Sequence, residues 1–183
     1  MTVHIYTQTY AGIGARNTPS RVLSWMNEMA TRRAANEWLL RSGGARGADY
    51  AFQSGAGKHC EIFTASSDIP QWAFDVAEVY HPTWDRLSGY VRKLMARNSM
   101  IIFGEAGDDP VDEIICWTLG GEARGGTGQA LRIAEDWNIP VTNLYHRWIE
   151  DERAGLAQYT DIEDASEEFI LRMYQKHDQT HWE

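Results

Sequence analysis

The chain has 183 residues, 43% of them hydrophobic and 23% charged, which is typical of one globular domain that buries an apolar core without disulfides or metals. No stretch approaches the roughly 20 consecutive apolar residues of a membrane helix, so the sequence argues against a membrane-spanning protein. The formal net charge of −9 disfavours binding to long nucleic acids without excluding it, because phosphate backbones attract clustered Lys and Arg side chains.

The amino terminus and the cysteines indicate a cytoplasmic protein. The first ten residues, MTVHIYTQTY, lack the basic region and apolar run of a secretory signal. Cys60 and Cys116 are the only cysteines, and 55 residues separate them, which favours reduced core thiols over a disulfide or a zinc site. His177 and His181 have the i, i+4 spacing of helical metal ligands, but no third ligand accompanies them, so we predict no metal.

Short apolar runs alternate with amphipathic stretches, as in the repeated strand–helix units of a parallel sheet. A strand is expected over 6–13, and Thr18-Pro19-Ser20 opens a helix whose apolar residues fall on one face. A second strand over 37–42, a helix over about 45–55 and a third strand over 61–65 follow. The first third of the chain therefore predicts an α/β fold.

The pattern continues after a long connection over 66–85. The spacing of apolar residues predicts a helix over 87–103, although Met100–Phe103 alone could form a strand. A strand buried on both faces is expected over 112–118. A glycine-rich segment, a helix over 129–137 and a last strand over 140–144 complete the alternation.

These elements predict one Rossmann-like, doubly wound domain, in which a mostly parallel sheet carries helices on both faces. Its core covers about 6–144, and 145–183 form a carboxyl-terminal helical extension. An amphipathic helix over 162–174 lies in this extension, and we expect its apolar stripe to pack on the domain or on a second subunit.

Three glycine-rich turns follow three of the predicted strands: AGIGAR at 11–16, SGGARGAD at 42–49 and GGEARGGTGQA at 120–130. In a doubly wound sheet such turns meet at one edge, where helix amino termini point free N–H groups and a partial positive charge into a crevice. Glycine allows the backbone to approach a phosphate closely and to adopt positive φ. Each turn alone could be an ordinary helix cap, but three together predict an anion-binding site.

Four arginines lie in or beside these segments: Arg16, Arg46, Arg97 and Arg124. A guanidinium fork matches phosphate oxygens, whereas pairing with a carboxylate such as Asp49 or Glu122 would make each arginine an ordinary surface salt bridge. We favour Arg46 and Arg97 as ligand contacts.

The segments YAGIGARNTPS, LRSGGARGADYAF, RKLMARNSMI, DEIICWT and GGTGQALRIAEDWNIPV occur in this order over about 10–144. Their order resembles the SLOG superfamily, a Rossmann-like group that includes DNA-processing protein A and the Lonely Guy phosphoribohydrolases. The chain looks most like DprA-like and YspA-type members, in which a G-G-A-R-G-A-D turn, an R-N pair on a helix and a G-G-T-G turn recur. The resemblance implies a nucleotide-type ligand over the sheet edge and a homodimer or larger assembly.

The turns, the arginines and the resemblance together define the expected ligand contacts. They are Gly12, Gly14, Ala15, Arg16, Ser42, Gly43, Gly44, Arg46, Gly47, Asp49, Arg97, Asn98, Trp117, Thr118, Gly125, Gly126, Thr127, Gly128 and Gln129. Trp117 is included because a base could stack on its ring, although core packing is the commoner role of tryptophan.

No catalytic residue is assigned. The Lonely Guy enzymes resemble one another through a G-G-x-G-T-x-x-E signature whose glutamate assists N-glycosidic cleavage, whereas Gln129, Leu131 and Arg132 stand at the corresponding positions here. The nearest other carboxylates are Asp49, Asp112 and Glu122. A general base must reach its proton within a hydrogen bond, which the sequence does not show for any of them.

Our main hypothesis is therefore a protein that binds a nucleotide-derived, phosphate-bearing small molecule, as a sensor or as a sequestering protein for a signalling nucleotide. It requires no cofactor. One alternative is a nucleotide-cleaving enzyme, which the Lonely Guy resemblance implies. The other is a DprA-like recombination accessory that binds single-stranded DNA, which the net charge disfavours.

Overall fold

The computed structural model describes residues 6–66, 68–157 and 166–178. The chain divides into two compact units, Met1–Leu144 and Tyr145–Glu183. None of the helices in the described ranges combines the length and the apolar character needed to cross a bilayer.

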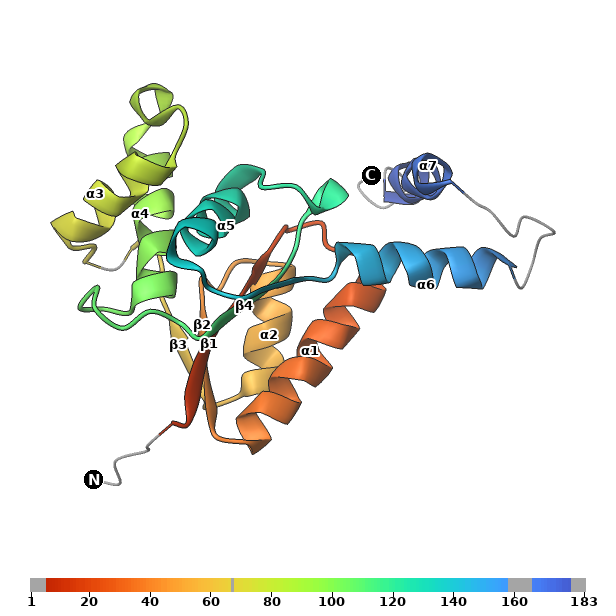
Figure 1. Cartoon of the computed structure of the whole chain (residues 1–183), viewed down its shortest axis with the longest axis horizontal. Helices are drawn as coiled ribbons and strands as arrows, with labels where there is room; N and C mark the ends of the chain where they lie inside the picture. Colours follow the sequence, from red (N-terminus) through yellow and green to blue (C-terminus); the bar gives the residue numbers. More distant parts are fainter. Residues whose placement is uncertain (1–5, 67, 158–165, 179–183) are drawn as a thin grey trace. The chain divides into compact units, whose positions relative to one another are not determined.

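A five-stranded, all-parallel sheet forms the centre of the first unit (Figure 1). Its strands are β1 (Gln8–Gly14), β2 (Trp38–Ser42), β3 (Cys60–Ile62), β4 (Glu113–Trp117) and β5 (Val141–Asn143). They lie in the order β3-β2-β1-β4-β5, so the chain moves outward from β1 to β3 and then returns to the other side of β1. The predicted doubly wound α/β fold is confirmed, and its strand order reverses between β1 and β4.

Helices cover both faces of this sheet (Figure 1). On one face lie α1 (Ser20–Ala35) and α2 (Ala48–Ala56), and on the other lie α3 (Gln71–Tyr80), α4 (Gly89–Phe103) and α5 (Gly125–Trp137). Single turns of 3-10 helix follow α3 and β4, as η1 (Trp84–Arg86) and η2 (Leu119–Gly121).

Alternate residues of the strands face the two helical layers. Ile13 of β1 packs in the same core cluster as Ile101 of α4. Its neighbour Gly12 faces the other layer, where an added Cβ would lie 2.6 Å from the Cγ atom of Phe52. Because the partner of Ile13 in β4 is Cys116, the next residue, Trp117, shares the face of Gly12. This alternation decides which residues at the strand ends reach a ligand beside α4 and α5.

The helix α3 occupies half of the segment 66–85, which we predicted to be a long connection. α3 buries Ala73 and Ala77, which lie one turn apart and face the core. Pro70 is the N-cap residue of α3, and Pro82 follows two residues after its end. Proline is well tolerated at both places, so the two prolines mark the boundaries of a helix rather than its absence.

The start of one helix differs from the prediction, and the end of another decides between two alternatives. α5 begins at Gly125 instead of Gln129, so the third glycine turn is the first turn of the helix itself. α4 stays helical through Met100–Phe103, which removes the strand alternative for that segment.

The second unit contains α6 (Tyr145–Ala157) and α7 (Glu167–Asp178). The two helices contact each other, since the ring centroids of Trp148 and Tyr174 lie 5.1 Å apart. α6 has no counterpart among the predicted elements. α7 corresponds to the helix predicted over 162–174, of which 162–165 lie outside the described residues.

Candidate functional site

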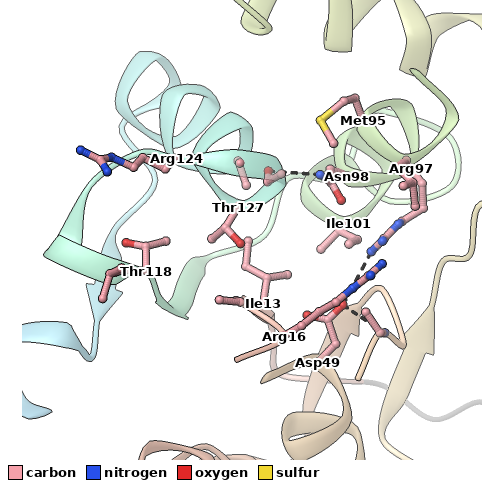
Figure 2. A pocket seen from close by; sticks show the side chains of 18 residues that line it. Ile13, Arg16, Asp49, Met95, Arg97, Asn98, Ile101, Thr118, Arg124 and Thr127 are labelled. Atoms are coloured by element: carbon pink, nitrogen blue, oxygen red, sulfur yellow. Dashed lines mark hydrogen bonds and ion pairs between the residues drawn. The ribbon is translucent and has the colours of Figure 1, made fainter. Parts of the chain in front are cut away.

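A pocket of about 400 Å³ opens at the carboxyl ends of β1 and β4, where the strand order reverses (Figure 2). This is the position at which doubly wound sheets bind their ligands. All three glycine-rich segments reach it. The predicted contacts that line the pocket are Gly14, Ala15, Arg16, Asp49, Arg97, Asn98, Thr118, Gly125, Gly126 and Thr127.

The remaining predicted contacts lie outside the lining: Gly12, Ser42, Gly43, Gly44, Arg46, Gly47, Trp117, Gly128 and Gln129. Gly12 and Trp117 face the α1–α2 layer, on the other side of the sheet from α4 and α5. The Trp117 ring is fully buried there and belongs to the core, so it offers no stacking surface. Arg46 is exposed and is not among the residues around the pocket.

Several of these residues shape the pocket from behind. The Gln129 side-chain nitrogen donates to the Met95 carbonyl oxygen at 3.2 Å and joins α5 to α4. An added Cβ on Gly47 would lie 2.5 Å from the Arg16 carbonyl oxygen, so only glycine allows the second turn to approach the first. Ser42 donates its hydroxyl to the Gly12 carbonyl oxygen at 2.6 Å.

Arg97 and Asp49 form a buried charged pair at one end of the pocket (Figure 2). The Arg97 Nη1 and Asp49 Oδ2 atoms lie 3.8 Å apart, and the two side chains are 10% and 7% exposed. This separation is longer than a hydrogen bond. The Arg97 Nε atom is buried and has no hydrogen-bond partner among the described residues. The guanidinium therefore has more donors than its protein surroundings provide acceptors.

A second guanidinium lies on the same side of the pocket. Arg16 is exposed at the pocket rim, and Figure 2 shows its side chain extending towards Asp49 and Arg97. Burial lowers the pKa of Arg97, the neighbouring Asp49 and Tyr90 raise it, and Arg16 lowers it again by like-charge repulsion. Two cations thus face one buried carboxylate at this end of the pocket.

The Asp49 carboxylate holds the first two glycine turns together. Its Oδ2 atom accepts the Ala45 N–H at 3.3 Å, and the Gly14 and Gly43 amides also donate to this carboxylate. Burial raises the pKa of Asp49, while Arg97 and the three amides lower it. Our expectation of free amides at these turns is therefore wrong for Gly14 and Gly43, because a side chain of the protein occupies them.

The third turn presents a different arrangement. The N-cap residue of α5 is Arg124, whose side chain makes no capping hydrogen bond. The first amides of a helix have no partner within the helix, and they carry the positive end of its dipole. Asn98, which follows Arg97 on α4, donates its side-chain nitrogen to the Gly126 carbonyl oxygen at 3.1 Å. This hydrogen bond holds the start of α5 beside the part of α4 that carries Arg97.

Apolar side chains form the wall between these polar groups: Ile13, Leu94, Met95, Ile101, Leu119 and Ala130. They were not among the predicted ligand contacts, because core residues have the same helical spacing. What identifies Leu94 and Ile101 in the sequence is their spacing from Arg97. Leu94 precedes it by three residues and Ile101 follows it by four, so all three share one face of α4.

Of the three candidate carboxylates, Asp49 lines the pocket and the other two do not. The Asp112 carboxylate accepts the Thr9 N–H at 2.8 Å near the amino ends of the strands, and Glu122 forms an ion pair with the exposed Arg124 side chain. Burial raises the pKa of the Cys116 thiol to about 12, which leaves it unreactive. Within the described residues no three His, Cys, Asp or Glu side chains could hold a metal ion, and His181 lies outside them.

No protein-family model and no curated protein sequence matches the chain. Among solved structures, DNA processing protein A from Helicobacter pylori superposes with a TM-score of 0.54. This chain has a DprA-like fold. The superposition covers 75% of this chain at 18% identity, and this chain spans 65% of its DprA counterpart. The structure of that DprA was described for a single-stranded DNA binding mode.

Proposed function

We propose that this protein binds single-stranded DNA and that one nucleotide of the strand occupies the pocket, with a phosphate on Arg97 and Arg16. The observation that carries the proposal is the buried Arg97 guanidinium, whose Nε atom has no acceptor among the described residues and whose counter-ion lies 3.8 Å away. A buried cation with unused donors is costly, and a phosphate oxygen would supply the missing acceptors.

The shape of the pocket supports a nucleotide as the bound unit. Its volume of about 400 Å³ falls within the range of about 300–1,000 Å³ that is typical of small-ligand pockets. The apolar wall that includes Leu94, Met95 and Ile101 suits a base or a sugar, and the arginine end suits a phosphate. The DprA-like fold favours single-stranded DNA as the source of that nucleotide.

The environment of Asp49 supports binding rather than cleavage. A general acid or base must exchange its proton with the substrate. The Asp49 oxygens already accept amide hydrogens from two glycine turns and face Arg97. We therefore propose that Asp49 organises the pocket and takes no part in a hydrolytic reaction.

A free phosphate-bearing nucleotide is the second candidate ligand. The net charge of −9 and the size of the pocket, close to that of one nucleotide, favour a small molecule over a long strand. In this alternative the protein senses or sequesters a signalling nucleotide on the same arginine pair. Both candidates need no cofactor. Self-association stays a prediction, which light scattering of the purified protein would check.

Fluorescence anisotropy with a labelled oligothymidylate at about 50 mM salt, where phosphate contacts are strongest, tests the proposal. Thymidine monophosphate, ADP-ribose and cyclic dinucleotides are then added as competitors. We expect the oligonucleotide to bind and Arg97→Met to weaken it about tenfold or more, because a charged hydrogen-bond donor is lost. Tight binding of one of these small molecules in calorimetry, without oligonucleotide binding, would favour the second candidate instead.

Gly43→Ala provides an independent test of the same guanidinium. An added Cβ at this position would lie 1.3 Å from Arg97 Nη1, so alanine displaces the guanidinium without removing its charge. Gly43 is not among the glycines with positive φ, so alanine adds no backbone strain. We expect Gly43→Ala to weaken binding as Arg97→Met does. Arg32→Met, which changes a 79% exposed side chain on α1, is the control. Wild-type protein that binds no nucleotide in any form would refute the proposal.

A further inference from the structure

The face of α4 that lines the pocket continues beyond it to Tyr90. Residues seven apart in an α-helix lie almost above one another, so Tyr90 and Arg97 share this face, with Leu94 between them. Leu94 and Arg97 line the pocket, whereas Tyr90 lies beyond the lining, about 10 Å along the helix axis from Arg97. An aromatic side chain therefore stands at the outer end of the pocket face.

The Tyr90 ring is available to a ligand. Tyr90 is 66% exposed, whereas Arg97 is only 8% exposed. The phenol is close enough to the Arg97 guanidinium to raise the pKa of that arginine. The backbone that carries it is fixed, because the Ser88 hydroxyl accepts the Val91 N–H at 3.4 Å and caps α4. Tyr90 thus presents its ring from an anchored helical turn.

Lys93 adds an exposed positive charge along the same side of the helix. It follows Tyr90 by three residues and precedes Arg97 by four, which are the spacings of neighbours on a helix surface. No ion-pair partner of Lys93 occurs among the described residues. An exposed aromatic ring, an exposed ammonium and a buried guanidinium therefore follow one another along α4 towards the pocket.

We propose that Tyr90 stacks on the base of the nucleotide next to the one in the pocket, and that Lys93 faces the phosphate between them. This inference rests on the proposed binding of single-stranded DNA and names the path of the strand away from the pocket. A single strand offers one phosphate and one flat base per nucleotide, and proteins bind it by alternating cations with aromatic rings. A ligand limited to one nucleotide would not reach Tyr90.

The test measures the affinity of the full chain for a labelled oligothymidylate and for thymidine monophosphate. Tyr90→Ala should weaken oligothymidylate binding about tenfold, because one stacked base is lost, and should leave the affinity for thymidine monophosphate unchanged. Tyr90→Phe keeps the ring and should bind as the wild type does. Tyr50→Ala is the matched control, since Tyr50 is 65% exposed on α2 and outside the pocket lining.

Arg97→Met separates this inference from the proposed function. If Arg97→Met weakens both ligands while Tyr90→Ala weakens neither, the stacking role is wrong and the pocket remains a nucleotide site. Equal weakening by Tyr90→Ala and Tyr50→Ala, or equal loss of both ligands in Tyr90→Ala, also overturns it. Wild-type protein that binds neither ligand refutes the function and the inference together. A 2-aminopurine base next to the pocket nucleotide should lose fluorescence on binding to the wild type but not to Tyr90→Ala.

Discussion

Asp49 and a bound phosphate would compete for the same guanidinium. Asp49→Asn keeps an oxygen acceptor for the Ala45, Gly14 and Gly43 amides but removes the negative charge beside Arg97. We expect this variant to bind oligothymidylate more tightly than the wild type. We do not expect its free energy of unfolding to fall, because burial raises the pKa of Asp49, so the fold already favours the neutral carboxyl over the ionised one. Urea unfolding with and without the oligonucleotide tests both expectations.

The pH dependence of binding tests the same competition. Because burial raises the pKa of Asp49, the folded carboxyl keeps its proton to a higher pH than the unfolded one. Its contribution to stability is complete below the ordinary carboxyl pKa and is lost as the pH rises through the raised pKa of the folded state. Between these two pKa values, a fall in pH neutralises Asp49 while a phosphodiester stays charged. Arg97 then has no competing carboxylate and can bind the phosphodiester. Wild-type affinity should therefore rise there. An equal rise in Asp49→Asn would assign the effect to other groups.

At the scale of the element, the start of α5 depends on two glycines for different physical reasons. An added Cβ on Gly128 would lie 2.4 Å from the backbone of Ala123, whereas Gly125 has open space around it but a φ of +59°. Gly128→Ala should lower the free energy of unfolding by about 1–3 kcal/mol through overpacking and should displace the turn from the pocket. Gly125→Ala should cost about 1 kcal/mol of backbone strain with little loss of affinity. Thermal unfolding and anisotropy compare the two variants. Unchanged affinity in Gly128→Ala would show that this turn does not hold the ligand.

The strands and the turns could be predicted from the sequence because each combines two local signals, an apolar run and the glycines that end it. α3 lies within the connection predicted over 66–85, although Pro70 and Pro82, which flank this helix, suit the two ends of a helix. The candidate ligand site could also be predicted only in part from the sequence. Arg97 could be selected by residue type, but the exclusion of Trp117 depends on its register with β1, which the sequence alone does not contain. Leu94 and Ile101 have the spacing of core residues whether or not a pocket lies over them.

For the whole molecule, the distribution of charge matters more than its sum. Of the 26 acidic residues, ten lie in 145–183, together with four of the 17 Lys and Arg residues. Six of the nine net negative charges therefore belong to the second unit, and the first unit, which contains the pocket, is only weakly acidic. The charge of the first unit by itself therefore opposes a phosphate at Arg97 less than the net charge of the whole chain suggests.

The salt dependence of binding depends on how many phosphates the protein neutralises. For a single strand, the logarithm of the affinity falls against the logarithm of the salt concentration by about 0.7 for each phosphate that the protein neutralises. Contacts by Arg16 and Arg97 to one phosphate and by Lys93 to the next predict a slope of about −1.4, much shallower than that of a basic DNA-binding protein. Lys93→Met should reduce the slope by about 0.7 and leave the affinity for thymidine monophosphate unchanged. Anisotropy titrations over a range of NaCl concentrations measure the slope for the wild type and for Lys93→Met. A slope steeper than about −4 would mean that many phosphates are neutralised on an extended surface. Such a surface would replace the pocket and the adjoining face of α4 as the site of binding.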